Sequence, residues 1–306
     1  MYRQWFQAIT WNDNCMELAM LPARETTIRQ HSMTTLTMAG LTDPGRLRRR
    51  NEDRIALHPE IGLVVLADGM GGHNAGEVAS HLAVDVMIRH CVNALAAEPD
   101  PAAGHNPKLC GHEQGALHSA IEAANIVIHE MACHNPECAG MGSTVVAALF
   151  QDDALCVAHV GDSRLYRLRD SRLQLLTEDH SVVQELLNRG LLTPEQARQS
   201  VSKNLVTRAL GVDARVQIDM GTHATEPGDL YLLCSDGLND VLTDVQIEHL
   251  LAAHGADPDA AAHRLVDATN QAGGPDNISV ILVRTDKRFR RARKTAQKLL
   301  KKLGDA

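Results

Sequence analysis

The chain has few aromatic residues and no long apolar run. Only 3% of its 306 residues are Phe, Trp or Tyr, so aliphatic side chains and Met must build the core. No apolar stretch approaches the ~20 residues that span a bilayer, and the N-terminus lacks the features of a signal peptide. The seven cysteines are irregularly spaced, as is typical of free thiols in a reducing compartment. These absences predict a cytoplasmic protein without disulfides.

Three motifs of phosphate and acyl chemistry are also missing. The chain has no Gly-x-x-x-x-Gly-Lys-Ser/Thr loop, no Cys followed six residues later by Arg, and no Gly-x-Ser-x-Gly elbow. A covalent nucleophile is therefore not indicated. Hydrolysis by metal-activated water is the economical alternative, because a bound dication lowers the pKa of water to about 7.

Charge is distributed unevenly. The net charge is −8, but residues 287–306 carry nine Lys or Arg and one Asp, which is +8, so residues 1–286 carry −16. Such an acidic body repels nucleic acid, and we expect no nucleic-acid partner. Apolar residues of the basic tail recur at helical spacing. Its helix would dock on an acidic partner, on an anionic membrane surface or on the body itself, or it would be a frayed, solubilising terminus.

The pattern divides the chain into three parts. Residues 1–40 have no clear periodicity and are predicted to be a loosely ordered extension; the alternative is a docking arm, for which Trp5, Phe6 and Trp11 are the only argument. Residues 41–286 are predicted to form the catalytic domain, and residues 287–306 the basic amphipathic tail.

Strands and helices of the central part come in separate runs. An apolar stretch over 62–67 suits a buried strand, and Asn74 with Glu77 resembles a helix-capping box. A second helix is predicted over 113–132. Further strands are predicted at 143–150, 154–160, 164–169, 215–221, 230–234 and 278–283, and further helices near 181–189, 194–200, 243–253 and 258–271. Runs of strands with short turns and paired helices predict an antiparallel α+β layer protein.

Acidic residues stand where several of these strands end. Asp68, Asp236 and Asp276 each lie beside Gly or Pro and next to an apolar run, and a further run over 48–53 reads Arg-Arg-Arg-Asn-Glu-Asp. Each Asp alone is most simply a turn residue. If they converge, their charges repel unless hard cations such as Mg²⁺ or Mn²⁺ lie between them.

Seven motifs occur together in one order. They are Arg48-x-x-Asn51-Glu52-Asp53, Asp68-Gly69-Met70-Gly71-Gly72-His73, Gly140-Met141-Gly142-Ser143-Thr144, Gly161-Asp162-Ser163-Arg164, Thr207-Arg208-Ala209-Leu210-Gly211, Ser235-Asp236-Gly237-Leu238 and Asp276-Asn277-Ile278-Ser279. In these motifs, over about residues 41–285, the chain resembles bacterial members of the metal-dependent protein phosphatase family (PPM, type 2C). The resemblance implies a central β-sandwich of two antiparallel sheets flanked by pairs of α-helices, with a metal centre at one end.

The resemblance also implies roles for site residues. Two divalent ions, Mn²⁺ or Mg²⁺, would be held by Asp68, the Gly69 carbonyl, Asp236 and Asp276, with Asp68 bridging both. Glu52 and Asp53 would hold metal-bound waters. Asp162 with Asp236, aided by Asp240, would bind a third, weaker ion.

Arg48 would bind the substrate phosphate, for which a guanidinium fork is suited. Arg48, Asp68 and Asp236 would form the catalytic set, in which metal-activated water attacks phosphorus without a phospho-enzyme.

The chain departs from the family pattern in places. Met70 stands where many eukaryotic members have a proton-donating His, so a metal-bound water would protonate the leaving group; His73 is a poorer substitute because it opens a helix. Ser200-Val201 replaces a His-Pro pair in the flap segment 177–206. A Cys/His group off the family pattern offers soft ligands for zinc, although its irregular spacing favours scattered loop and core residues. It comprises His105, Cys110, His112, His118, Cys133, His134 and Cys138.

The resemblance implies a monomeric phosphoprotein phosphatase that hydrolyses phosphoserine and phosphothreonine and opposes a bacterial Hanks-type kinase, with type VI secretion as one association. Membrane-surface contact would depend on the basic tail. The alternatives are a pseudophosphatase that binds phosphoproteins without turnover, which the complete ligand set disfavours, and a hydrolase of small phosphate esters.

Overall fold

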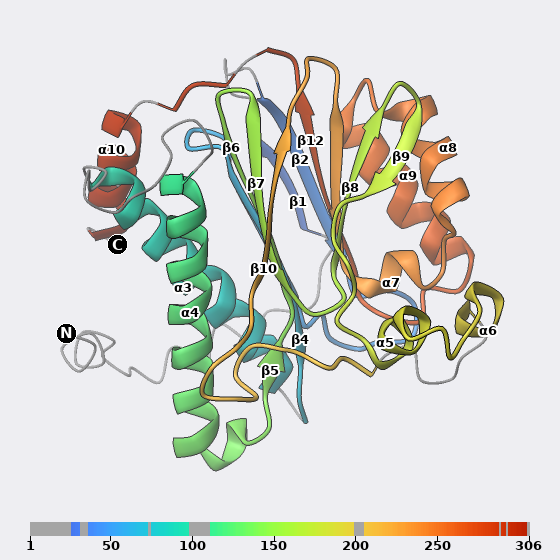
Figure 1. The fold of residues 1–306 in the computed structure, drawn as a ribbon, viewed down its shortest axis with the longest axis horizontal. Coiled ribbons are helices and arrows are strands. Elements are labelled where there is room, and N and C mark those ends of the chain that lie inside the picture. The colour runs from blue at the N-terminus through green and yellow to red at the C-terminus, as the bar shows by residue number, and fades with distance from the viewer. Residues whose placement is uncertain are drawn as a thin grey trace.

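Two antiparallel sheets packed face to face form the centre of the molecule (Figure 1). The computed structural model describes residues 26–30, 36–72, 75–97, 111–198, 205–287, 289–291 and 293–304. The first sheet, in the order β1-β2-β12-β11-β8-β9, contains β1 (Thr26–Gln30), β2 (Leu36–Asp43), β8 (Arg164–Arg169), β9 (Arg172–Leu175), β11 (Leu230–Cys234) and β12 (Ile278–Thr285). The second, in the order β10-β7-β6-β4-β3 with β5 on β4, contains β3 (Asp53–His58), β4 (Leu63–Met70), β5 (Gly142–Ser143), β6 (Val145–Gln151), β7 (Ala154–Val160) and β10 (Asp219–Ala224).

Central strands are apolar on both faces because both faces are covered. In β4, Val64 and Leu66 point into the core between the sheets, whereas Leu63 and Val65 pack under the helices of the second sheet. All four side chains are fully buried. This explains why the stretch over 62–67 has no polar alternation.

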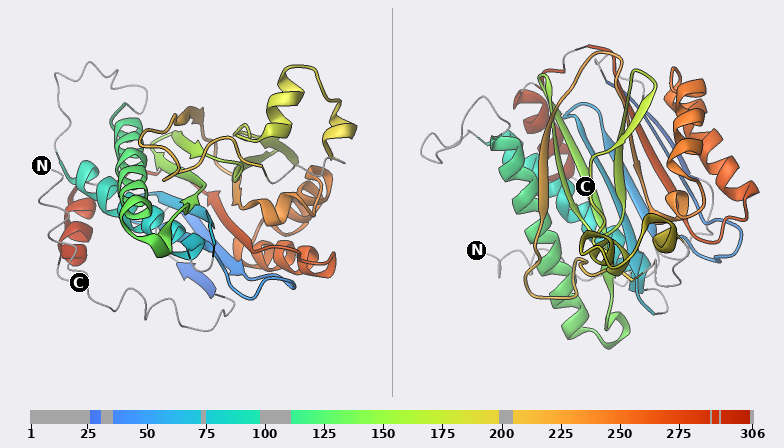
Figure 2. Two further views of the ribbon diagram at one scale, coloured as in Figure 1. Left: turned by 90° about the horizontal axis from the view of Figure 1, so that it is seen from below. Right: turned by 45° about the vertical axis from the view of Figure 1, so that its right-hand side comes forward.

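Helices cover the two outer faces (Figure 2). The second sheet carries α3 (Ala75–Ala96) and α4 (Gly111–His134), and the first carries α8 (Asp244–His254) and α9 (Pro258–Gln271). The short helices η1 (Pro136–Cys138), α5 (Val182–Asn188), α6 (Pro194–Arg198) and α7 (Asp236–Asn239) lie in connections. The predicted sandwich flanked by helix pairs is confirmed. None of the helices among the described residues is long and apolar enough to span a membrane.

The C-terminal segment packs on the body. Helix α10 (Arg293–Gly304) contacts α3 and buries Ala296 there. Phe289 joins the core between the sheets, and Arg291 forms a largely buried ion pair with Glu113 of α4, at 2.7 Å. Of the alternatives left open for residues 287–306, docking on the body is the one seen.

Two predicted boundaries differ from the structure. Strand β2 begins at Leu36, inside the predicted extension 1–40, because Leu36 and Met38 belong to the core between the sheets. The aromatic residues proposed for a docking arm lie outside the described residues. The strand predicted over 215–221 is displaced: Val216 and Ile218 pack against the helical layer before β10 begins at Asp219.

Candidate metal centre

Five aspartates from both sheets gather at one end of the sandwich, toward the lower side of Figure 1 where α7 and β5 lie. Asp53 begins β3 and is paired in register with Asp68 of β4. Asp236 follows β11 and begins α7, while Asp162 and Asp276 each stand two residues before a strand, β8 and β12 respectively. Antiparallel pairing brings the ends of these strands together, as the turn-like motifs predict.

The pKa values of these carboxyls show how close the groups are. Burial, followed by the charges of Asp53 and Asp236, raises the pKa of Asp68 well above its ordinary value. Burial, followed by Asp162 and Asp276, does the same for Asp236. Burial also raises the pKa of Asp53 to about 6 and that of Asp162 to about 7. Mutual repulsion among poorly solvated carboxylates is the chemistry of a site built for divalent cations.

Asp53 provides a direct test of that fit. One carboxylate oxygen, Oδ2, accepts a hydrogen bond from Ser235 Oγ at 2.8 Å, and the Ser235 hydroxyl accepts in turn from the Ser279 backbone N–H. The other oxygen, Oδ1, is buried and has no hydrogen-bond partner among the described residues. A buried carboxylate oxygen without a donor is costly, and a hydrated cation beside it would remove that cost. The carboxylates at this end of the sandwich therefore fit the divalent cations that the sequence predicts.

Two glycines allow the aspartates to converge. A Cβ on Gly69 would lie 1.9 Å from the Gly76 carbonyl oxygen, and a Cβ on Gly237 would lie 1.9 Å from that of Asn277. Any side chain at either position would push the neighbouring backbone away. These Asp-Gly pairs are therefore points of close backbone approach as well as turn signals.

The backbone of Asp68 is held by the Ser143-Thr144 motif. The Thr144 hydroxyl accepts from the Asp68 N–H, and the Thr144 N–H and Ser143 hydroxyl both donate to the Asp68 carbonyl. The Thr144 hydroxyl also contacts that of Ser163 at 2.8 Å, which links Asp68 to the turn that carries Asp162.

Arg48 lies at the rim of this centre. Its side chain is 52% exposed and donates to Asp276 at 2.8 Å, and its charge opposes the burial that raises the pKa of Glu52. Asp240 is exposed on the other side of the centre, and its charge contributes to the raised pKa values of Asp162 and Asp236. The structure thus brings together all nine residues named from the sequence, Gly69 included.

Asn277 has a role that motif reasoning missed. Its amide donates to the carbonyls of Pro44 and Arg50, and its oxygen accepts from the Glu52 N–H. These three bonds fasten the loop that bears Arg48 to the start of β12. The Asp-Asn pair signals a turn, but the loop it holds is 225 residues away in sequence, so the signal does not identify its partner.

Other predicted features are absent or lie elsewhere. Met70 sits half-buried on β4 and has no group that can transfer a proton. His73 and the Ser200-Val201 pair lie outside the described residues. Among the described residues, the Cys/His group offers no set of three converging ligands; the one such set is His159, His180 and Asp219.

Sequence comparison connects the chain to known proteins. A family model described as protein phosphatase 2C matches residues 48–268. The serine/threonine protein phosphatase PstP of Mycobacterium tuberculosis is 38% identical over 249 residues, or 81% of this chain and 44% of that protein. The serine/threonine phosphatase stp of Listeria monocytogenes is 36% identical over 251 residues, or 80% of this chain and 94% of that protein. The chain thus spans less than half the length of the mycobacterial relative.

Solved structures agree. The crystal structure of M. tuberculosis PstP/Ppp superposes with a TM-score of 0.72 at 36% identity, covering 82% of this chain and 99% of that one. The PstP catalytic domain in complex with two manganese ions gives a TM-score of 0.68 at 36% identity, with 81% and 97% covered. PppA, a regulatory component of type VI secretion in Pseudomonas aeruginosa, gives 0.67 at 36% identity, with the same coverage.

Proposed function

Because the chain belongs to the protein phosphatase 2C family, we propose that it is a Mg²⁺- or Mn²⁺-dependent phosphatase that hydrolyses phosphoserine and phosphothreonine in proteins. The observation that carries the proposal is the group of buried and half-buried aspartates with raised pKa values at the end of the sandwich. Asp68, the Gly69 carbonyl, Asp236 and Asp276 are its proposed ligands for two ions. The two manganese ions of the PstP complex support this number.

When bound, the ions would activate water as the nucleophile and neutralise charge on the phosphoryl group. The protein side chains would orient these partners. Asp53 and Glu52 would hold water at the ions, through the unpartnered Asp53 oxygen and the half-buried Glu52 carboxylate. Asp162 and Asp240 would bind a third, weaker ion beside Asp236.

Arg48 would bind the substrate phosphate. It is half-exposed and already close to a proposed ligand, Asp276. Its planar fork matches two phosphate oxygens and stays charged throughout the working pH range. Because Met70 cannot donate a proton, leaving-group protonation would come from water at the centre.

The wider setting is also proposed. Named relatives are serine/threonine phosphatases, which supports phosphoprotein substrates and an opposing bacterial Ser/Thr kinase in a signalling pathway. The likeness to PppA makes type VI secretion one candidate pathway. We infer a monomer in the cytoplasm; five cysteines among the described residues are free thiols, which suits a reducing compartment.

One set of assays tests the proposal. A phosphothreonine peptide and a simple aryl phosphate are incubated with wild type, Asp236→Asn and the control Asp267→Asn, which changes an exposed carboxylate on α9. Wild type and control should turn over both substrates with Mn²⁺ and neither with chelator. Asp236→Asn should lose on the order of a hundredfold or more in kcat/KM, because several kcal/mol of charge stabilisation disappear.

Each alternative has its own result. Turnover of the aryl phosphate alone would indicate a hydrolase of small esters. Phosphopeptide binding without metal-dependent turnover in the wild type would indicate a pseudophosphatase. Neither is expected, since the raised pKa values of the clustered aspartates support a metal centre.

A further inference from the structure

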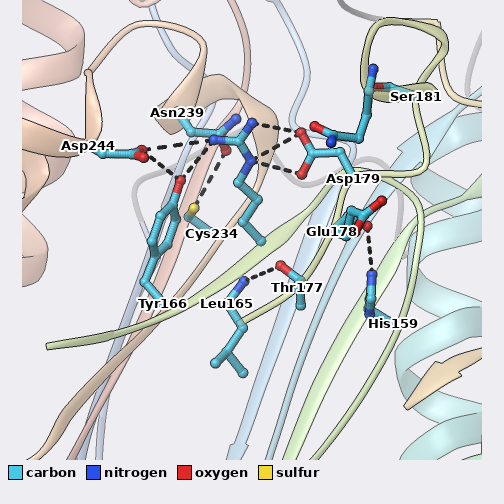
Figure 3. A network of polar contacts seen from close by, with 12 residues as sticks. His159, Leu165, Tyr166, Thr177, Glu178, Asp179, Ser181, Cys234, Asn239 and Asp244 are labelled. Atoms are coloured by element: carbon cyan, nitrogen blue, oxygen red, sulfur yellow. Dashed lines mark hydrogen bonds and ion pairs between the residues drawn. The ribbon is translucent and has the colours of Figure 1, made fainter. Parts of the chain in front are cut away.

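A five-residue stretch, Thr177–Glu178–Asp179–His180–Ser181, is fastened to the turn that carries Asp162. We call residues 177–181 the anchor segment. Thr177 Oγ1 accepts from the Leu165 N–H at 3.0 Å, and Asp179 accepts three hydrogen bonds of 2.7–3.1 Å from the Arg164 guanidinium. Figure 3 shows Thr177 and Asp179 facing the start of β8. Ser181 then caps α5, the first helix of the predicted flap.

His180 makes the closest contact with the turn. Its backbone N–H donates to the Gly161 carbonyl, and its Nδ1 accepts from the Gly161 N–H, each at 3.0 Å. One buried residue thus satisfies both backbone groups of the glycine that precedes Asp162. Gly161 itself has a φ of 105°, and a Cβ there would meet Thr144 at 2.6 Å, so the turn has little freedom to adjust.

The far side of the His180 ring faces a carboxylate. Its Nε2 lies 3.2 Å from Asp219 Oδ2 without the geometry of a hydrogen bond, and Asp219 Oδ1 accepts from Arg208 at 2.7 Å. The His159 ring stacks on His180 with centroids 4.7 Å apart. Figure 3 shows the bond between His159 Nε2 and the Glu178 carbonyl. Because Nδ1 accepts a hydrogen bond, the proton of neutral His180 resides on Nε2 and faces Asp219.

His159, His180 and Asp219 lie close enough together to resemble a metal site. However, their side chains are not arranged to act as metal ligands. The Nδ1 lone pair of His180 is already used, and Nε2 is protonated. The two rings are only 20° from parallel, so their in-plane lone pairs do not converge on one point. Arg208 also places a cation on Asp219, where a metal ion would be repelled. The group is better described as a set of electrostatic and stacking contacts around the His180 ring.

We propose that His180 is a positioning residue of the phosphatase: by accepting the Gly161 N–H it holds the turn that places the Asp162 carboxylate beside Asp236, and thereby sets the affinity of the third cation. The inference rests on the proposed function. Its physical basis is that Asp162 directly follows Gly161, whose N–H and carbonyl both bond to His180, so a displacement of this turn moves the Asp162 carboxylate. Outer groups that orient ligands typically change metal affinity about 10–100-fold when lost.

Two near-isosteric variants separate positioning from packing. In His180→Asn the amide oxygen takes the place of Nδ1 and can still accept the Gly161 N–H. In His180→Gln the amide reaches toward Asp219, and the acceptor at Nδ1 is lost. Both variants remove the imidazole and its stacking on His159, so a merely structural role would impair them alike.

The readouts are Mn²⁺ titration by calorimetry, the Mn²⁺ dependence of phosphopeptide hydrolysis, and the Tm in chelator. We expect His180→Gln to lose the weakest Mn²⁺ binding step and to need about tenfold more Mn²⁺ for half-maximal rate, whereas His180→Asn stays near wild type. Equal behaviour of the two variants, whether impaired or not, would overturn the inference. Absence of turnover in the wild type would instead overturn the proposed function.

A measurement on the unmodified protein guards against variants that do not fold. In metal-free wild type labelled with ¹⁵N-histidine, long-range ¹H–¹⁵N correlation should show His180 as the Nε2–H tautomer with an unprotonated Nδ1. A protonated Nδ1 could not accept the Gly161 N–H and would overturn the inference on its own.

Discussion

At the scale of single residues, Asn277 shows how much one side chain can organise. It uses its carbonyl oxygen and both amide hydrogens to join the loop around Arg48 to β12 while only 6% exposed. Its substitution should therefore affect both stability and substrate binding, although it touches neither the proposed ions nor the phosphate.

Asn277→Ala should lower the free energy of unfolding by about 1–3 kcal/mol, because buried backbone groups lose their partners. It should also raise KM for a phosphopeptide, since the loop bearing Arg48 is released. Urea unfolding and steady-state kinetics measure the two effects. The control is Asn93→Ala on the exposed face of α3, which should change neither; an unchanged KM in Asn277→Ala would contradict the loop-holding role.

Gly237 offers a steric test. Gly237→Ala should lower the free energy of unfolding by about 1–3 kcal/mol, because the new Cβ would lie 1.9 Å from the Asn277 carbonyl oxygen. It should also weaken Mn²⁺ binding by separating Asp236 from Asp276. Gly115→Ala, where no atom lies within 4 Å of the added Cβ, should be neutral or slightly stabilising in α4. Thermal unfolding with and without Mn²⁺ compares them.

Residues of the proposed site could be predicted from the sequence where they belong to motifs, but not where their role depends on long-range contacts. The proposed ligands carry motifs that the sequence displays directly, and the structure brings them together. The contacts of Asn277 and His180 depend on which strands pair and which loops cross, and the partners are 19 to 233 residues apart in sequence. The spacing of residues along the sequence does not indicate which distant segments will contact each other.

At the scale of elements, the basic C-terminal segment packs on the body of the protein and contributes to its core. Phe289 fills the space between the sheets, α10 covers α3, and Arg291 with Glu113 is 6% and 11% exposed. Charge dominates this segment in the sequence, so its burial was only one of several alternatives. The apolar positions at helical spacing were the informative signal.

Arg291→Ala should destabilise the protein by about 3–5 kcal/mol, because it leaves the largely buried Glu113 charged and unpaired. Adding Glu113→Gln should recover part of that loss. Chemical denaturation of both single variants and the double variant completes the cycle. The control Lys301→Gln, an exposed change on α10, should leave the free energy of unfolding unchanged. If the effects of Arg291→Ala and Glu113→Gln simply add, the two residues are not a coupled pair.

At the scale of the whole molecule, the acidic centre links stability to pH and metal. Burial raises the pKa of Asp162 to about 7, above its ordinary 3.8, so between pH 6.5 and 8 the metal-free folded chain releases protons that the unfolded chain has already lost. Stability therefore falls as pH rises through this window. Histidines oppose this trend at the lower end of the window: burial lowers the pKa values of His81, His90, His159, His180 and His223, whereas unfolded histidine is still about half protonated at its ordinary pKa of about 6.5. Comparison with Asp162→Asn isolates the contribution of the carboxyl.

In chelator, raising the pH from 6.5 to 8 should lower the Tm of the wild type relative to that of Asp162→Asn, which lacks the titrating carboxyl. Mn²⁺ should raise the wild-type Tm more at pH 8, where fewer protons compete for the carboxylates. Differential scanning calorimetry of both proteins at both pH values measures this. An equal Mn²⁺-induced rise at both pH values would show that proton release and metal binding are not linked.

The centre also draws its carboxylates from both sheets: Asp53 and Asp68 belong to one, and Asp236 and Asp276 flank strands of the other. Neither sheet alone contains the proposed ligand set, so under the proposed function hydrolysis would require the closed sandwich. Among the described strands, β12 is the last in chain order. A nascent chain in which β12 has not yet paired would therefore be silent toward phosphoproteins.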